Sequence, residues 1–273
     1  MHIITLCSFK GGTAKTSTAL SVGACLAKFH KKRVLLIDFD SQANLSIGLG
    51  IGPDSEKTMV PVLQDKSTIK DVIHKTEIPG LFLVPANAYL DGIERTPQIG
   101  SDPYAHERLR RALLPLNEEY DFCFIDTPPS LGWLTQSAFF ASHYNLICAI
   151  PEAYSVIALR RLKEFQETMQ KYHTVDVLGV VLTFWDERGA VNKTILEEIE
   201  GSFPSKLLRS KVRRDISVSR AVFQGAPVID FASEGRAAGD YRGLTKEILE
   251  IIECKNPKSQ LENLRKTKKT AKA

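Results

Sequence analysis

The chain has 273 residues, of which 43% are hydrophobic and 25% charged, as is usual for a globular protein. This length is enough for one large domain with a well-buried core. No run of about 18 apolar residues is present, which excludes a transmembrane helix, and the first residues lack the composition of a signal peptide. We therefore expect a cytoplasmic protein.

The net charge of +4 is unevenly distributed. Residues 255–273 contain seven basic side chains and one acidic side chain, which leaves the preceding residues slightly acidic. This last segment has few apolar residues and is expected to be disordered. The sequence therefore predicts a single domain over residues 1–254, followed by a basic tail over residues 255–273.

Short apolar runs that lack polar alternation predict buried strands of a mainly parallel sheet at residues 3–7, 33–39, 81–86, 121–127, 145–150 and 177–184. Segments with helical patterns lie between and after these runs, at residues 15–29, 104–116, 155–171, 191–201 and 243–253. We expect a short helix at residues 68–75 and surface loops at residues 51–68 and 89–103. The alternation of strands and helices predicts a doubly wound α/β fold.

The segment "SFKGGTAKTS", residues 8–17, joins the first expected strand to the first expected helix. A phosphate-binding loop needs backbone N–H groups around a concavity, a helix N-terminus behind it and a lysine that reaches the outer phosphates. Gly11 and Gly12 supply the turn, Lys15 the cation, and the Thr16 hydroxyl a ligand for Mg²⁺. Ala14 stands where the loop formula has glycine; if that position needs a positive φ, we expect local strain of about 1 kcal/mol.

Three carboxylates lie at the C-terminal ends of expected strands: Asp38 and Asp40 in "LLIDFDSQAN" and Asp126 in "FCFIDTPPS". Ligands of open α/β sheets bind beyond the carboxyl ends of the strands, which is where the loop also lies. Carboxylates at this edge can hold metal-bound water and orient an attacking water molecule. The loop and these carboxylates together predict a Mg²⁺–nucleotide site.

Five segments, in order, resemble the ParA/Soj/MinD family of dimerising ATPases, whose phosphate loop is a deviant Walker A motif. The loop "FKGGTAKTS" is similar to K-G-G-x-x-K-[ST], "IDFDSQANLSIGLG" to the family's first switch, and "FIDTPPSLGWLT" to its Walker B and second switch. The segments "VVLTFWDER" and "KVRRDISVSRA" match later parts of the family. The resemblance covers roughly residues 1–253.

The resemblance implies an ATP-sandwiched homodimer with ATP and Mg²⁺ as cofactors. Lys10 would then reach the phosphates of the other subunit and act with Lys15 and Asp40 in catalysis, with Asp40 positioning the water. Thr16, Asp38 and Asp126 would lie near the metal. The nucleotide would be held by Lys10, Gly11, Gly12, Thr13, Ala14, Lys15, Thr16 and Ser17. Ala14 and Ser41 depart from the family's usual glycine and proline, so we expect slow hydrolysis that a partner stimulates.

Two branches of the family differ in what the dimer binds. Soj-like members bind DNA without sequence preference, whereas MinD-like members bind membrane through an amphipathic C-terminal helix. The tail here shows no apolar face, while Arg188, Arg213, Arg214 and Arg220 could neutralise DNA phosphates. We therefore expect a nucleoid-associated partition ATPase that binds double-stranded DNA and a ParB-like activator. The alternatives are a MinD-like membrane-associated ATPase and a nucleotide-dependent clamp with little hydrolysis.

Overall fold

The computed structural model describes residues 1–52 and 55–255. Apart from Lys255, which ends the last helix, the predicted basic tail lies outside the described residues. The described residues form an eight-stranded sheet in the order β3-β4-β2-β5-β1-β6-β7-β8, in which only β3 is antiparallel to its neighbour. The strands are β1 (His2–Cys7), β2 (Val34–Asp38), β3 (His74–Lys75), β4 (Leu81–Val84), β5 (Phe122–Asp126), β6 (Tyr144–Ala149), β7 (Asp176–Trp185) and β8 (Leu207–Arg213).

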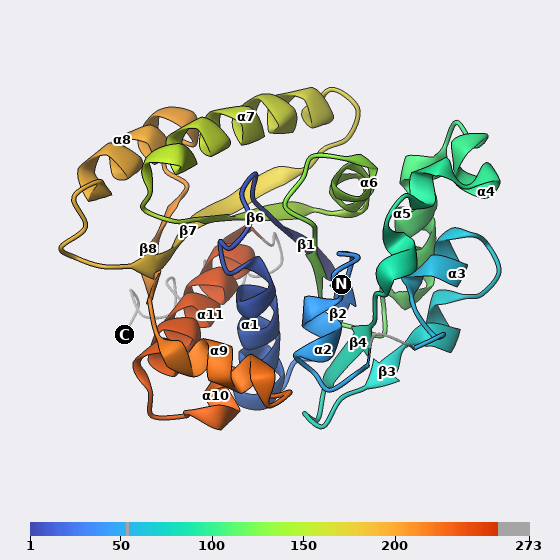
Figure 1. Ribbon diagram of the computed structural model, residues 1–273, viewed down its shortest axis with the longest axis horizontal. Coiled ribbons are helices and arrows are strands. Elements are labelled where there is room, and N and C mark those ends of the chain that lie inside the picture. Colours follow the sequence, from blue (N-terminus) through green and yellow to red (C-terminus); the bar gives the residue numbers. More distant parts are fainter. Residues whose placement is uncertain (53–54, 256–273) are drawn as a thin grey trace, which may run out of the picture.

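Helices cover both faces of this sheet (Figure 1). They are α1 (Lys15–His30), α2 (Asn44–Ile47), α3 (Met59–Leu63), α4 (Pro97–Gly100), α5 (Arg108–Leu113), α6 (Trp133–Ala141), α7 (Ala153–Gln170), α8 (Asn192–Ser202), α9 (Ile216–Phe223), α10 (Val228–Phe231) and α11 (Arg236–Lys255). The predicted doubly wound, mainly parallel α/β fold is confirmed. None of the helices in the described ranges is long and apolar enough to cross a membrane.

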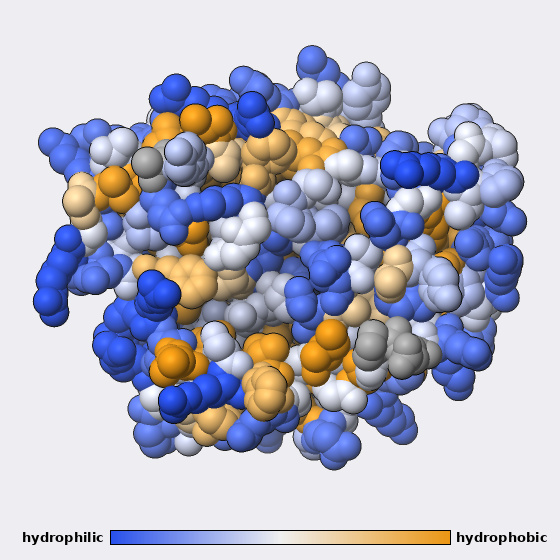
Figure 2. Space-filling model, in the orientation of Figure 1, coloured by the Kyte–Doolittle hydropathy of each residue, from blue (hydrophilic) through white to orange (hydrophobic). Residues whose placement is uncertain are grey.

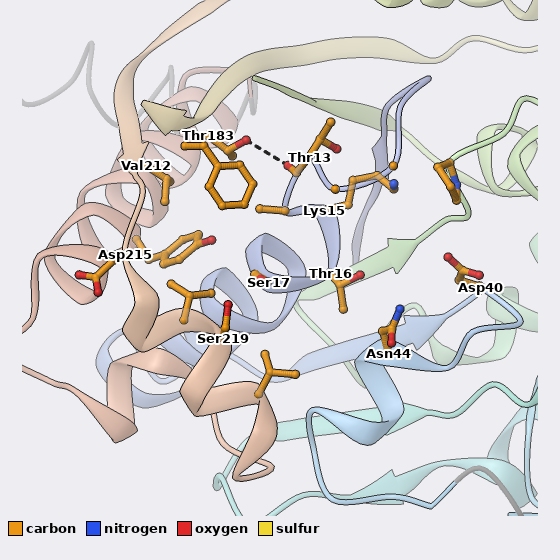
Figure 3. A pocket seen from close by; sticks show the side chains of 18 of the residues that line it. Thr13, Lys15, Thr16, Ser17, Asp40, Asn44, Thr183, Val212, Asp215 and Ser219 are labelled. Atoms are coloured by element: carbon orange, nitrogen blue, oxygen red, sulfur yellow. Dashed lines mark hydrogen bonds between the residues drawn. The ribbon is translucent and has the colours of Figure 1, made fainter. Parts of the chain in front are cut away.

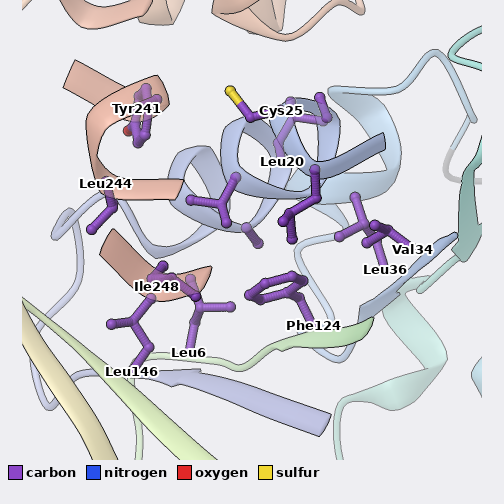
Figure 4. Close-up of a cluster of buried hydrophobic side chains, with 14 of the residues drawn as sticks. Leu6, Leu20, Cys25, Val34, Leu36, Phe124, Leu146, Tyr241, Leu244 and Ile248 are labelled. Carbon is purple, nitrogen blue, oxygen red and sulfur yellow. The ribbon is translucent and has the colours of Figure 1, made fainter. Parts of the chain in front are cut away.

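The central strands are buried on both faces, which explains why their sequences lack alternation. Leu36 of β2 packs with α1 and α11 on one face, and its neighbour Leu35 packs towards α5 and α6 on the other. Figure 4 shows the first of these clusters, in which Leu20 of α1 and Ile248 of α11 lie over Leu6 and Phe124 of the sheet. The buried strands fix the positions of the loops at their carboxyl ends.

Parts of the sequence-based prediction are wrong in local detail. Residues 68–75 form a short 3₁₀ helix (Ile69–Val72) followed by β3, not a single helix. The segments expected to be surface loops contain α3 and α4, whose apolar side chains Met59 and Ile99 are buried in the core. These helices of four or five residues are too short to leave a helical period in the sequence.

The ring of His106 lies between Trp133 and Phe140, at centroid distances of 5.7 and 5.8 Å. Its Nδ1 is buried without a hydrogen-bond partner among the described residues, and burial lowers the pKa of the imidazole. A histidine whose pKa is lower in the folded protein binds a proton more readily in the unfolded chain. Folding is therefore not opposed by this histidine above its unfolded pKa of about 6.5, and the free energy of unfolding decreases as the pH falls below that value. We expect acidification from about pH 7 to about pH 5 to lower the free energy of unfolding less in His106→Phe than in the wild type.

Urea unfolding at both pH values measures this difference. Other titrating groups contribute to both proteins and cancel in the comparison. An equal loss of stability in the two proteins would show that His106 does not titrate on unfolding.

Candidate functional site

The segment from Ser8 to Ala14 forms a loop between β1 and α1 at the carboxyl edge of the sheet. Gly12 has a φ of 72°, and a Cβ there would meet no atom within 4 Å, so this part of the loop faces open space. The backbone turns directly into α1, whose first N–H groups carry the partial positive charge of a helix N-terminus. The loop therefore has the backbone geometry of an anion site.

Ala14 has a φ of 56° and a ψ of 28°, which is the left-handed conformation that glycine adopts most easily. The expected strain at this position is thus confirmed. Lys31, at the opposite end of α1, has nearly the same conformation, with a φ of 53°. The same helix is therefore flanked by two strained residues, one beside the loop and one remote from it.

We expect Ala14→Gly and the matched control Lys31→Gly each to raise the free energy of unfolding by about 0.5–1 kcal/mol, because both relieve left-handed strain. Only Ala14→Gly should change the rate of ATP hydrolysis, and it should raise that rate. Urea unfolding and steady-state phosphate release measure the two effects. If both variants hydrolyse ATP at the wild-type rate, Ala14 does not limit catalysis.

Lys15 is a buried cation: its exposed fraction is only 7%. Its Nζ donates a hydrogen bond to the hydroxyl of Ser8 at 3.2 Å. Among the described residues it has no carboxylate within ion-pair distance. The charge of Lys15 acts on the carboxyl of Asp126 from beyond ion-pair distance and offsets part of the rise in its pKa. A buried ammonium without a direct ion pair is still incompletely compensated, so a bound anion would stabilise it.

Two buried carboxylates lie below the loop, where Asp38 of β2 is the register partner of Asp126 of β5. The hydroxyl of Thr16 donates a hydrogen bond to Asp126 Oδ2 at 2.6 Å, whereas Asp126 Oδ1 is buried without a partner among the described residues. Burial raises the pKa of Asp126 to about 7, and the nearby Asp38 adds to the effect. A cation here would relieve this repulsion and satisfy the free oxygen.

Asp38 has a different environment. Its Oδ2 accepts hydrogen bonds from the Ser46 N–H at 2.8 Å and from the Ser46 hydroxyl at 2.7 Å. Its Oδ1 accepts one from the Asp40 N–H at 3.3 Å, and burial raises its pKa to about 6. These hydrogen bonds hold the loop that carries Asp40 in place. The role of Asp38 near the metal stays a prediction.

The residues present fit Mg²⁺ with further ligands from outside the chain. No group of three or more acidic, histidine or cysteine side chains in the described ranges could hold a metal ion alone. The hydroxyl of Thr16 and the carboxylate of Asp126 are oxygen ligands of the kind that Mg²⁺ takes, and it usually keeps waters and phosphate oxygens as its other ligands. The site is therefore suited to a metal that arrives with a phosphate group.

A cavity of about 480 Å³ extends from the loop towards β8 and α9. Figure 3 shows Lys15, Thr16 and Asn44 at one end, with Val212, Asp215 and Ser219 at the other. The polar end lies over the helix N-terminus, and the far wall is made largely by apolar side chains, namely Phe184, Val212, Val218, Val222 and Tyr241. This arrangement suits a ligand with phosphates at one end and a flat base at the other.

Sequence reasoning missed this far wall. In the sequence, residues 211–221 match a later part of the family and their arginines are assigned to DNA, but the pattern does not predict that they include the end of β8 and the start of α9 beside a cavity. The signal that was available is the basic residue at every second position of "LRSKVR", from Arg209 to Arg213, which is typical of a strand with one exposed face.

Asp40 and Lys10 differ in their relation to the cavity. Asp40 lines the cavity, and its Oδ1 accepts a hydrogen bond from the Gln42 N–H at 3.1 Å. Lys10 does not line the cavity; its ammonium group forms an ion pair with Glu152, just before α7. Within one chain, Lys10 is therefore directed away from the place where a ligand would bind.

The four predicted DNA-binding arginines are exposed but have different partners. Arg213 forms an ion pair with Asp240, at 2.6 Å between Nη2 and Oδ1, and also lines the cavity. The side chains of Arg188, Arg214 and Arg220 make no ion pair with any described residue. These three are thus the better candidates for contacts with phosphate.

Comparison with known proteins agrees with this geometry. A family model described as an AAA domain matches residues 1–177. A ParA family protein of Chlamydia muridarum is 48% identical over 252 residues, which are 92% of this chain and 99% of that protein. The chain belongs to the ParA family. The chromosome partitioning protein ParA of Caulobacter vibrioides is 32% identical, and the match covers 91% of this chain and 94% of that one.

A solved structure with the same fold is cobyrinic acid a,c-diamide synthase from Mycobacterium smegmatis with bound ADP and magnesium. It is 25% identical, has a TM-score of 0.81, and the match covers 94% of this chain and 97% of that one. The ATP and Mg²⁺ that the sequence predicts for this ParA family member agree with the ligands of that structure.

Proposed function

We propose that this chain is a Mg²⁺-dependent ATPase of DNA partitioning, which dimerises on ATP, binds DNA as a dimer and is reset by hydrolysis. The observation that carries the proposal is Lys15, a buried cation whose only hydrogen bond in the described ranges is to Ser8, at the mouth of a cavity shaped for a nucleotide. The membership of the chain in the ParA family supports the same function.

The residues divide the chemistry among them. The backbone N–H groups from Gly11 to Ser17 and the ammonium of Lys15 bind the phosphates. Thr16 and Asp126 would hold Mg²⁺, which would supply positive charge to the phosphate groups. Asp40 orients the attacking water with the carboxylate oxygen that Gln42 leaves free. Hydrolysis by a single chain is slow because a cation opposite the γ-phosphate is missing.

Lys10 supplies that cation to the other subunit of a dimer. It does not line the cavity of its own chain, and its ion-pair partner among the described residues is Glu152, in a pair that is exposed to solvent and therefore weak. Its release from Glu152 costs little, whereas contact with a γ-phosphate in a closed interface stabilises both the dimer and the developing charge. Dimerisation and hydrolysis are coupled through this side chain.

DNA binding by the dimer relies on Arg188, Arg214 and Arg220, with a smaller part for Arg213, whose guanidinium is already paired. Contacts with phosphate alone give binding that is independent of sequence and falls steeply with salt. A ParB-like, DNA-bound protein is the proposed activator, and the nucleoid is the proposed location. Polar and charged side chains dominate the face of the molecule shown in Figure 2, interrupted by smaller apolar patches.

The experiment that tests this function is retention of a random DNA duplex by the protein with ATP and Mg²⁺. We expect binding that requires ATP, and Arg214→Glu should weaken it about tenfold and reduce the salt dependence by about one phosphate contact per chain. The matched control Arg95→Glu, an exposed arginine away from this surface, should bind as the wild type does. Retention that is equal with and without ATP would refute an ATP-switched DNA-binding function.

A further inference from the structure

Helix α9 has two functional faces. One face of the helix lines the nucleotide cavity through Val218, Ser219 and Val222. On the other face, Ile216 and Phe223 are 67% and 92% exposed. Such exposure is unusual for a phenylalanine and an isoleucine seven residues apart on one short helix, because apolar residues at this spacing normally mark a buried face.

The exposed face borders a groove of about 370 Å³ between α9 and α10, lined by Ile216, Ser219, Arg220, Phe223, Gln224 and Phe231. Figure 2 shows hydrophobic surface in the region where Figure 1 places α9 and α10. From Ile216 to Phe223 the helix rises about 10 Å, which matches two turns of a partner helix with apolar side chains at i, i+4 and i+7.

Residues 214–236 contain three arginines and three acidic side chains, Asp215, Asp230 and Glu234, and Lys28 pairs with Asp230, so the net charge around the groove is only slightly positive. Arg220 lines the groove, and Arg214 and Arg236 lie just before and after in the chain. None of these three side chains has an ion-pair partner in the described ranges, whereas the nearby Asp230 is paired with Lys28. We propose that this groove docks an acidic amphipathic helix of a partner protein, with its apolar side chains against Ile216 and Phe223 and its carboxylates on Arg220.

Other occupants fit less well. A second copy of this face would bring the same net positive charge to the contact, and any twofold arrangement with Arg220 near the axis would place the two arginines together. The basic segment 256–273 has the same sign of charge as the groove. DNA would meet Arg220 but would leave Phe223 against charged phosphates without burying it.

Docking at the groove is coupled to the nucleotide through α9. Ser219 lines both the groove and the nucleotide cavity, so a partner that shifts or rigidifies α9 changes the affinity for ATP, and ATP changes the affinity for the partner by the same factor. An acidic partner also competes with DNA for Arg220. This coupling rests on the proposed ATP site, whereas the docking itself does not.

The test uses the full chain without nucleotide and a fluorescent amphipathic peptide of about 18 residues built from leucine, alanine and glutamate. A peptide with lysine in place of glutamate and a scrambled peptide of the same composition are the controls, and fluorescence anisotropy reports binding. The acidic peptide should bind, and Phe223→Ser should weaken it about tenfold. Arg220→Glu should reverse the preference towards the lysine peptide.

Tyr172→Ser, which removes another exposed aromatic ring just after α7, is the matched control and should bind the acidic peptide as the wild type does. Equal binding of the scrambled peptide, wild-type binding by Phe223→Ser, or no binding of the acidic peptide would overturn the proposal. So would binding to vesicles of anionic phospholipid that depends on Phe223 while the peptide does not bind, because the face would then be a membrane contact.

A second measurement separates this proposal from the ATPase function. Saturating peptide should change the ATP affinity by about fivefold or more. A protein that binds the peptide but not ATP would refute the proposed function and leave the docking site standing. A protein that binds both, with no mutual effect, would refute the coupling through α9.

Discussion

Replacing Asp40 by asparagine should lower the rate of ATP hydrolysis by about 100-fold or more, while ATP still binds and still drives dimerisation. The change keeps the size of the side chain and removes its charge. Asp40 lines the nucleotide cavity, and one of its oxygens is left free by the hydrogen bond from Gln42 to the other. An amide in its place orients water poorly, because it cannot accept the proton that the water loses.

Steady-state phosphate release measures this effect, with ATP binding followed separately. The matched control Asp91→Asn makes the same chemical change at an exposed carboxylate that does not line the cavity, and it should hydrolyse ATP at the wild-type rate. Near-normal turnover by Asp40→Asn would show that another group positions the water.

Replacing Lys15 by methionine should have opposite effects on the free and the nucleotide-bound protein. Lys15 is a buried cation without a carboxylate partner in the described ranges, so an apolar side chain of similar length should leave the free protein as stable as the wild type or more stable. The same change removes the charge that meets the phosphates and should weaken ATP binding by about 100-fold or more.

Thermal unfolding with and without Mg²⁺–ATP measures both effects, because a ligand that binds only the folded state raises Tm. The wild type should gain stability on adding ATP, and Lys15→Met should not. A variant that is markedly less stable than the wild type without nucleotide would show that the ammonium group has a structural partner. If ATP still stabilised Lys15→Met, the ammonium group of Lys15 would not be needed for ATP binding.

The parts of the fold that sequence predicted well are those whose physics is local. The central strands are buried on both faces, so runs such as "VLLID" identified them directly. The phosphate loop was visible because glycine, lysine and threonine occur there at fixed spacing between a strand and a helix. The same loop formula marked Ala14 as a residue that would be strained if its φ were positive, and the structure gives it a φ of 56°.

The far wall of the cavity could not be predicted in this way. Phe184, Val218 and Tyr241 come from β7, α9 and α11, and only the order of the strands brings them together. The groove on α9 has the same origin, since Phe231 of α10 meets α9 through tertiary packing. The role of Asp38 likewise depends on Ser46, eight residues away, whose backbone and side chain both turn towards it.

The most direct test of ATP-driven dimerisation is the mass of the protein in solution, measured by light scattering with and without Mg²⁺–ATP. One chain has a mass of 30.4 kDa. We expect a monomer without nucleotide and a particle of twice that mass with ATP. Lys10→Ala should weaken this transition, because the variant lacks the ammonium group that would reach the partner's phosphates. A protein that stays monomeric at saturating ATP, or that is dimeric whether or not ATP is present, would contradict the account.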